Sequence, residues 1–108
     1  MDAKALRDEV NQFEAELIEL DRSIAQMKIP PKHKAKTKKA RASISRVLQY
    51  ISGPRFLLRA RVMQGGELKQ SEREWADKAL ADAVKLRTAA MRDEIEPLLL
   101  IIQSIGDT

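Results

Sequence analysis

Residues 2–28 read DAKALRDEVNQFEAELIELDRSIAQMK, and their apolar side chains recur at alternating intervals of four and three residues. This spacing places one apolar stripe on a helix over three heptads. The stripe consists of Leu6, Val10, Phe13, Leu17, Leu20, Ile24 and Met27. Asp2 is suited to cap the helix, and Pro30 and Pro31 end it because neither can donate a backbone hydrogen bond. The sequence therefore predicts a helix over residues 2–28 and a Pro-Pro loop over residues 29–34.

A second apolar stripe follows the loop and is narrower than the first. It consists of Ala40, Ile44, Val47 and Ile51, and it predicts a basic helix over residues 35–52. Gly53 and Pro54 form a strong stop signal, because Gly suits a left-handed C-terminal position and Pro interrupts the hydrogen-bond ladder. Residues 54–64 fit either a short helix or a strand, and the absence of a second strand to pair with favours the helix.

The last helix is predicted over residues 71–105. Ser71 and Glu74 fit a capping box, in which each side chain bonds a backbone amide of the first turn. The apolar positions that follow lie roughly on one face, and they are Leu80, Val84, Met91, Ile95, Leu98, Ile102 and Ile105. Pro97 interrupts this pattern, so we expect the helix to kink near residues 93–96.

Charge indicates how these helices pack. The positions that flank the first stripe are mostly acidic, whereas those around the second stripe are basic. A parallel dimer of residues 2–28 would oppose acid to acid, so the basic helix over residues 35–52 is the better neighbour. The short connection then favours an antiparallel αα-hairpin. We predict an all-α single domain, a small bundle of three to four helices built on this long hairpin, with Trp75 anchoring the last helix onto it.

Composition excludes several classes of site. The chain has 108 residues, no Cys and one His, so disulfide scaffolds and thiolate metal sites are excluded. His33 lies in a lysine-rich loop with no obvious nucleophile beside it, and no carboxylate cluster carries the histidine of a helical metal site. We therefore expect a non-enzymatic protein with no metal and no cofactor. No apolar run approaches the roughly 20 residues that span a bilayer, and the start is charged, so we expect a cytoplasmic protein without membrane contact.

The charge is sorted along the chain. Residues 1–21 carry a net charge of −5, residues 22–66 carry twelve bases and no acid, and residues 67–108 carry −3. Such a basic stretch in a chain of net charge +4 is suited to contact phosphates. The candidate binding residues are Lys32, Lys34, Lys36, Lys38, Lys39, Arg41, Arg46, Arg55, Arg59 and Arg61. No aromatic residue lies within the lysine run, which argues against a platform for stacking single strands.

Three interpretations of this basic surface follow from the sequence. The first is docking on nucleic acid or on a nucleic-acid-bearing assembly, which the protein would block or regulate. The second is a helical adaptor or inhibitor that binds a protein partner through the same face or through the apolar C-terminal segment. The third is a solvated face that only balances the acidic first helix.

The C-terminal segment contains five consecutive aliphatic residues, 98–102. One face of an amphipathic helix hides only part of such a run, so a second surface must cover the rest. That surface is either the core of the same domain or another chain, which makes a homodimer possible. The candidate self-association residues are Leu98, Leu99, Ile101, Ile102 and Ile105.

Overall fold

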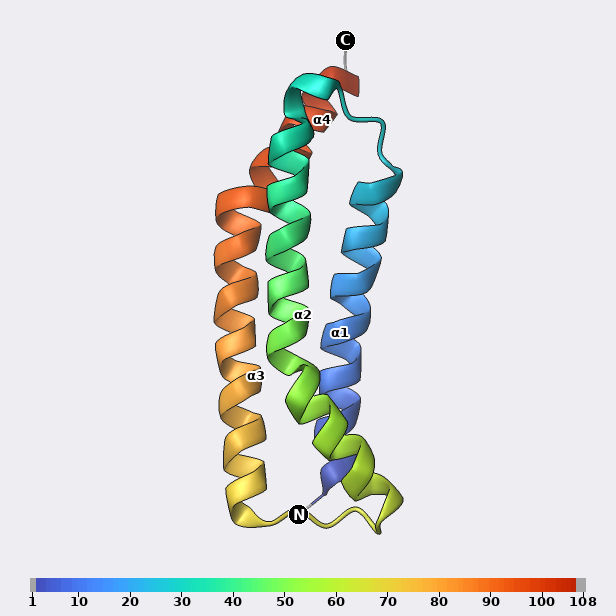
Figure 1. Ribbon diagram of the computed structural model, residues 1–108, viewed down its shortest axis with the longest axis vertical. Helices are drawn as coiled ribbons and strands as arrows, with labels where there is room; N and C mark the ends of the chain where they lie inside the picture. The colour runs from blue at the N-terminus through green and yellow to red at the C-terminus, as the bar shows by residue number, and fades with distance from the viewer. Residues whose placement is uncertain (1, 107–108) are drawn as a thin grey trace.

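Three long helices run side by side in the computed structural model, which describes residues 2–106 (Figure 1). The elements in chain order are α1 (Ala3–Gln26), the 3₁₀ turn η1 (Pro31–His33), α2 (Lys34–Met63), α3 (Gln70–Ala90), the π-helical turn η2 (Met91–Ile95) and α4 (Glu96–Gly106). Successive long helices run in opposite directions, and the molecule measures 55 × 20 × 18 Å. The prediction of an all-α bundle on a long N-terminal helix pair is confirmed.

The first helix is built as its apolar stripe predicts. The Asp2 side chain accepts a hydrogen bond from the Lys4 amide at 2.9 Å, which satisfies one of the free donors at the start of α1. Four stripe residues are buried, namely Val10, Phe13, Leu17 and Ile24. The other three, Leu6, Leu20 and Met27, are half-buried at the edges of the stripe.

The α1–α2 hairpin joins an acidic helix to a basic one. The two apolar stripes meet in one core cluster. Beside that core, Arg41 Nε lies 3.0 Å from Asp21 Oδ1, and Arg55 Nη1 lies 2.6 Å from Glu14 Oε2. Exposed pairs of this kind contribute about 0–1 kcal/mol each, so apolar burial supplies most of the stability and the charges favour the observed neighbour.

The predicted break at Gly53 and Pro54 is wrong, because α2 is one continuous helix from Lys34 to Met63. Pro54 removes the amide that would bond the carbonyl of residue 50, and Figure 1 shows the ribbon of α2 bending in this region. Gly53 does not adopt the left-handed conformation that a helix terminus would need. A proline in a helix interior costs about 3 kcal/mol, and burying Leu58 completely in the next turn returns roughly 1.5–3 kcal/mol.

The turn between α2 and α3 uses glycine where the backbone requires it. Gly65 and Gly66 have φ angles of +112° and +86°, values that other residues rarely adopt. The Gly66 carbonyl accepts a hydrogen bond from the Ala3 amide at 3.0 Å. This bond ties the turn to the beginning of α1 at the same end of the bundle.

The predicted capping box at Ser71 and Glu74 is also wrong, because α3 begins at Gln70. Glu72 takes the capping role, and its Oε1 accepts from the Lys69 amide at 3.0 Å. The same carboxylate is held by Arg61, whose Nε lies 3.0 Å from Oε2. The ion pair with Arg61 thus holds the carboxylate that caps α3, whose N-cap residue is Lys69 in place of Ser71.

The Arg61–Glu72 ion pair predicts acid sensitivity. The hydrogen bond from Arg61, followed by that from the Lys69 amide, lowers the pKa of Glu72 to about 2 from its ordinary value of 4.5. A lowered folded-state pKa stabilises the fold above pH 4.5, and this stabilisation disappears as the pH falls toward 2. We expect the wild-type protein to exceed Glu72→Gln in urea-unfolding free energy at pH 7, with the difference shrinking between pH 5 and pH 2. A difference that stays constant over that range would contradict the assignment.

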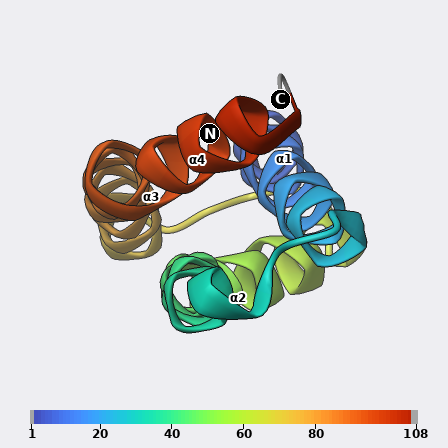
Figure 2. The same cartoon turned by 90° about the horizontal axis from the view of Figure 1, so that it is seen from above.

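The last predicted helix changes direction near Pro97, as expected, and is divided into α3, η2 and α4. Residues 91–95 form a π-helical turn, in which the Glu96 amide donates to the Met91 carbonyl. Pro97 lacks an amide and its ring would press on the carbonyl of residue 93, and a wider turn relieves both problems. Viewed from above, α4 leaves the end of α3 and crosses the bundle toward α1 (Figure 2). Ile95 and Leu98 are buried as a result.

Candidate nucleic-acid interface

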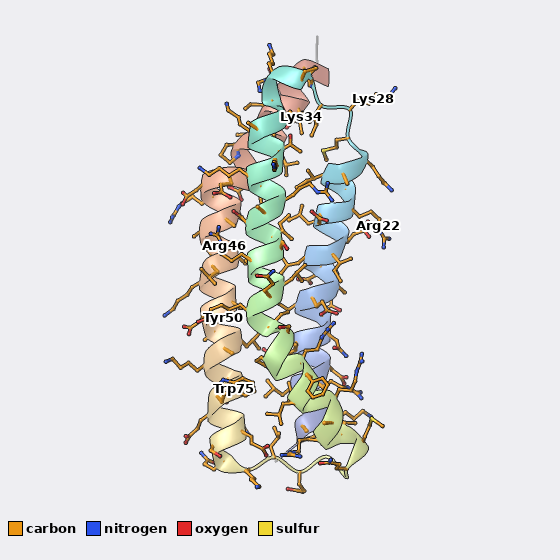
Figure 3. All side chains as sticks on the ribbon, in the orientation of Figure 1. Arg22, Lys28, Lys34, Arg46, Tyr50 and Trp75 are labelled. Carbon is orange, nitrogen blue, oxygen red and sulfur yellow. The ribbon has the colours of Figure 1, made fainter. Side chains whose placement is uncertain are left out.

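Five lysines surround the beginning of α2, and we call them the lysine surface: Lys32, Lys34, Lys36, Lys38 and Lys39. All five are exposed, and within residues 2–106 none of them forms an ion pair. Lys28, which the sequence analysis did not include, is also exposed and lies at the same end of the bundle as Lys34 (Figure 3). Lys28 directly precedes the Pro-Pro loop in the sequence, and this position could have grouped it with the other five lysines.

The backbone beneath the lysine surface is itself electropositive. The first turn of α2 contains no acid, and the His33 side chain makes no capping hydrogen bond. Free amides and the helix dipole give a helix N-terminus a partial positive charge, which disfavours cations and favours anions. Lys34 and Lys36 therefore lie where the helix dipole opposes their charge, and their ammonium groups suit an anionic ligand.

The arginines of the predicted surface divide into two groups. Arg41, Arg55 and Arg61 each bind an acid on a neighbouring helix or at the start of α3. The hydrogen bond and the charge of Asp21 raise the pKa of Arg41 above its ordinary value. These three side chains join structural elements, and their charge is partly neutralised. Arg46 and Arg59 are exposed and have no ion pair in the part of the chain that the structure describes.

Acidic residues limit the lysine surface on one flank. A hollow of about 290 Å³ lies between the start of α2 and the α3–α4 junction. Lys36 and Lys39 face Asp93 and Glu94 across it. The Glu94 carboxylate accepts a hydrogen bond from the Ser43 hydroxyl. Lys34 and Lys38, which share another face of α2, do not line this hollow.

A second hollow, about 410 Å³ in volume, lies between α2 and α3. Tyr50 and Trp75 line it, and their side chains remain 45% and 49% exposed. The expectation that Trp75 is a core anchor is therefore only half right. Its ring packs over Gly53, where an added Cβ would lie 3.2 Å from the indole, while the rest of the ring faces solvent.

The aliphatic C-terminal run is largely absorbed by the fold. Leu98 is 1% exposed, and Leu99 and Ile102 pack against the core. Leu98 is thereby unavailable for association, because the π turn directs it inward. Ile101 lines the smaller hollow, and Ile105 is 39% exposed. The possibility of a homodimer through these residues stays a prediction.

Neither metal binding nor membrane insertion is supported by residues 2–106. Between residues 2 and 106 no three His, Cys, Asp or Glu side chains come together as metal ligands. Over the same residues, no helix combines the length and the apolar character that crossing a bilayer requires. In comparisons with known proteins, no family model, no curated sequence and no solved structure matches the chain.

Proposed function

We propose that this protein is a small non-enzymatic module that docks its lysine surface on the phosphate backbone of a nucleic acid. The observation that carries the proposal is the gathering of five exposed lysines around the beginning of α2, none of which forms an ion pair within residues 2–106. The helix dipole destabilises positive charges near a helix N-terminus. A bound polyanion makes this electrostatic interaction favourable. Occluding or regulating a site on the nucleic acid is the expected consequence of docking.

The mechanism is electrostatic. A lysine that neutralises a phosphate releases condensed counterions, and this release favours binding without reading the base sequence. Lys34 and Lys39 are five residues apart on the helix, which corresponds to about 7.5 Å along its axis. A rigid patch of this size positions the protein on a backbone, and sequence preference would have to come from other contacts.

The salt dependence of binding tests this proposal. Five phosphate contacts give a slope of about −4.5 for duplex DNA in a plot of log affinity against log salt. Raising the salt from 50 to 200 mM should therefore weaken duplex binding about 500-fold, and single-strand binding about 100-fold. Fluorescence anisotropy with labelled mixed-sequence oligonucleotides measures both. Absence of binding at 50 mM salt would reject the proposal.

A protein partner is the second candidate, and two exposed apolar side chains favour it. Phe56 and Met63 are 77% and 82% exposed and lie two turns apart on α2, with Arg59 between them. Apolar anchors on a basic helix suit an acidic amphipathic helix as partner. Binding through these anchors would be nearly independent of salt, whereas phosphate binding falls steeply as salt is added.

A further inference from the structure

The hollow between α2 and α3 holds the only tyrosine and the only tryptophan of the chain. Tyr50 comes from α2 and Trp75 from α3, and about half of each side chain is open to solvent. Each ring contacts another residue that lines the hollow. The indole of Trp75 lies on the bare backbone at Gly53, and the Tyr50 hydroxyl donates to Asp82 Oδ2 at 3.5 Å. Because neither ring is buried in the core, both remain accessible to a ligand.

Two cations, Lys39 and Arg46, lie along α2 between the beginning of the helix and this hollow, and Asp93 and Glu94 line smaller hollows beside both. Lys39, Arg46 and Tyr50 follow one another at intervals of seven and four residues, so they share one flank of α2. The corresponding distances along the helix axis are about 10.5 Å and about 6 Å. Figure 3 shows Arg46, Tyr50 and Trp75 in this order along the side where α2 and α3 lie next to each other.

The chemistry of the hollow suits a nucleobase. Aromatic faces stack on every base, and a cation at the rim attracts the attached phosphate. Lys78 supplies that cation on the α3 side. The Asp82 carboxylate can only accept hydrogen bonds, so it repels phosphate but fits the amino groups of adenine, cytosine or guanine. A base in a duplex is already stacked, so this site selects unpaired bases.

We infer that the Tyr50–Trp75 hollow stacks an unpaired base of a single strand whose phosphates lie on Arg46 and the lysine surface. The inference rests on the proposed function and narrows it, because it names single-stranded nucleic acid as the preferred ligand. The sequence alone argued against stacking, since no aromatic residue lies in the lysine run. The fold supplies the two aromatics from helices that are distant in sequence.

Trp75 is itself the probe for the test, because its fluorescence reports only on this hollow. The full chain is titrated at 50 mM salt with a twelve-nucleotide single strand of mixed A and C. Parallel titrations use the same strand with abasic sites throughout and a twelve-base-pair duplex. We expect the intact strand to quench Trp75 fluorescence at saturation by at least a third, and the abasic strand and the duplex to leave it nearly unchanged.

A substitution in the hollow distinguishes the contribution of base stacking to the affinity from the contribution of charge. Tyr50→Leu should weaken binding of the intact single strand about 10-fold or more, with an unchanged salt slope and unchanged duplex binding. Phe56→Leu removes a more exposed aromatic ring on the same helix, outside the hollow, and should change neither affinity. Thermal unfolding by circular dichroism confirms that both variants are folded.

The outcomes distinguish this inference from the proposed function. Salt-dependent binding that is equal for Tyr50→Leu and wild type, without quenching of Trp75, would overturn the stacking site and leave the lysine surface in place. Failure of the wild-type protein to bind any of the three oligonucleotides would overturn both. Quenching by the intact strand together with a selective loss in Tyr50→Leu supports both.

Discussion

Replacing Lys32, Lys34 and Lys38 together by glutamate should reduce oligonucleotide binding by roughly two orders of magnitude or more at 50 mM salt. Three phosphate contacts are lost and three repulsive charges are added, so the salt slope should also fall by about three units. The three side chains are exposed and none of them forms an ion pair within residues 2–106. Anisotropy titrations at several salt concentrations measure the affinity and the slope.

The loss of binding should not come from unfolding. Glutamate near the beginning of a helix is favoured by the dipole by about 0.3–1 kcal/mol per residue, so the triple variant should melt at the wild-type temperature or above it. A matched control replaces Lys4, Lys69 and Lys85 by glutamate, which changes the net charge equally at exposed positions outside the lysine surface. If the control loses as much affinity as the triple variant, binding follows net charge and the lysine surface is not the interface.

The parts of the fold that the sequence predicted are those with long periodic signals. The stripe of α1 repeats over three heptads, and the opposite charges of α1 and α2 identify the partner helix. Local stop and start signals were less reliable. The helix continues through Pro54, and burial of Leu58 in the next turn offsets the cost. At the start of α3, Arg61 holds Glu72, eleven residues along the chain, and Lys69 is the N-cap residue in place of Ser71. Both errors arise where a tertiary contact outweighs a preference of about 1–3 kcal/mol.

The candidate site was predictable only as a concentration of charge. The sequence alone identifies the run of lysines, since an acid-free run needs no tertiary information to be recognised. It did not separate Arg41 and Arg55 from the lysines, because their partners lie across the hairpin. Tyr50 and Trp75 are 25 residues apart on different helices, and no periodic pattern links them. A site formed by residues of two helices can be recognised only when the packing of those helices is known.

The π turn explains why the last aliphatic run is buried. In a continuous α-helix, the buried positions of α3 at Leu80, Ala83 and Ala90 would continue to Glu94. The π turn contains one extra residue, so the core position passes from Glu94 to Ile95. Ile95 is fully buried, whereas Glu94 is half-buried and accepts from Ser43. The altered register thus keeps a carboxylate out of the core and sends α4 across the bundle.

Ile95→Ala should therefore destabilise the protein by about 2–5 kcal/mol, because the deleted atoms leave a cavity in the shared core. For a domain of this size, that loss corresponds to a melting temperature lower by roughly 10–30 °C. Leu100→Ala is the matched control on the same segment, since Leu100 is 65% exposed and its truncation should change stability by about 0.5 kcal/mol or less. Urea denaturation of both variants gives the free energies. Equal small losses would show that residues 91–95 do not direct Ile95 inward, and Glu94 would then have to occupy the core position despite its charge.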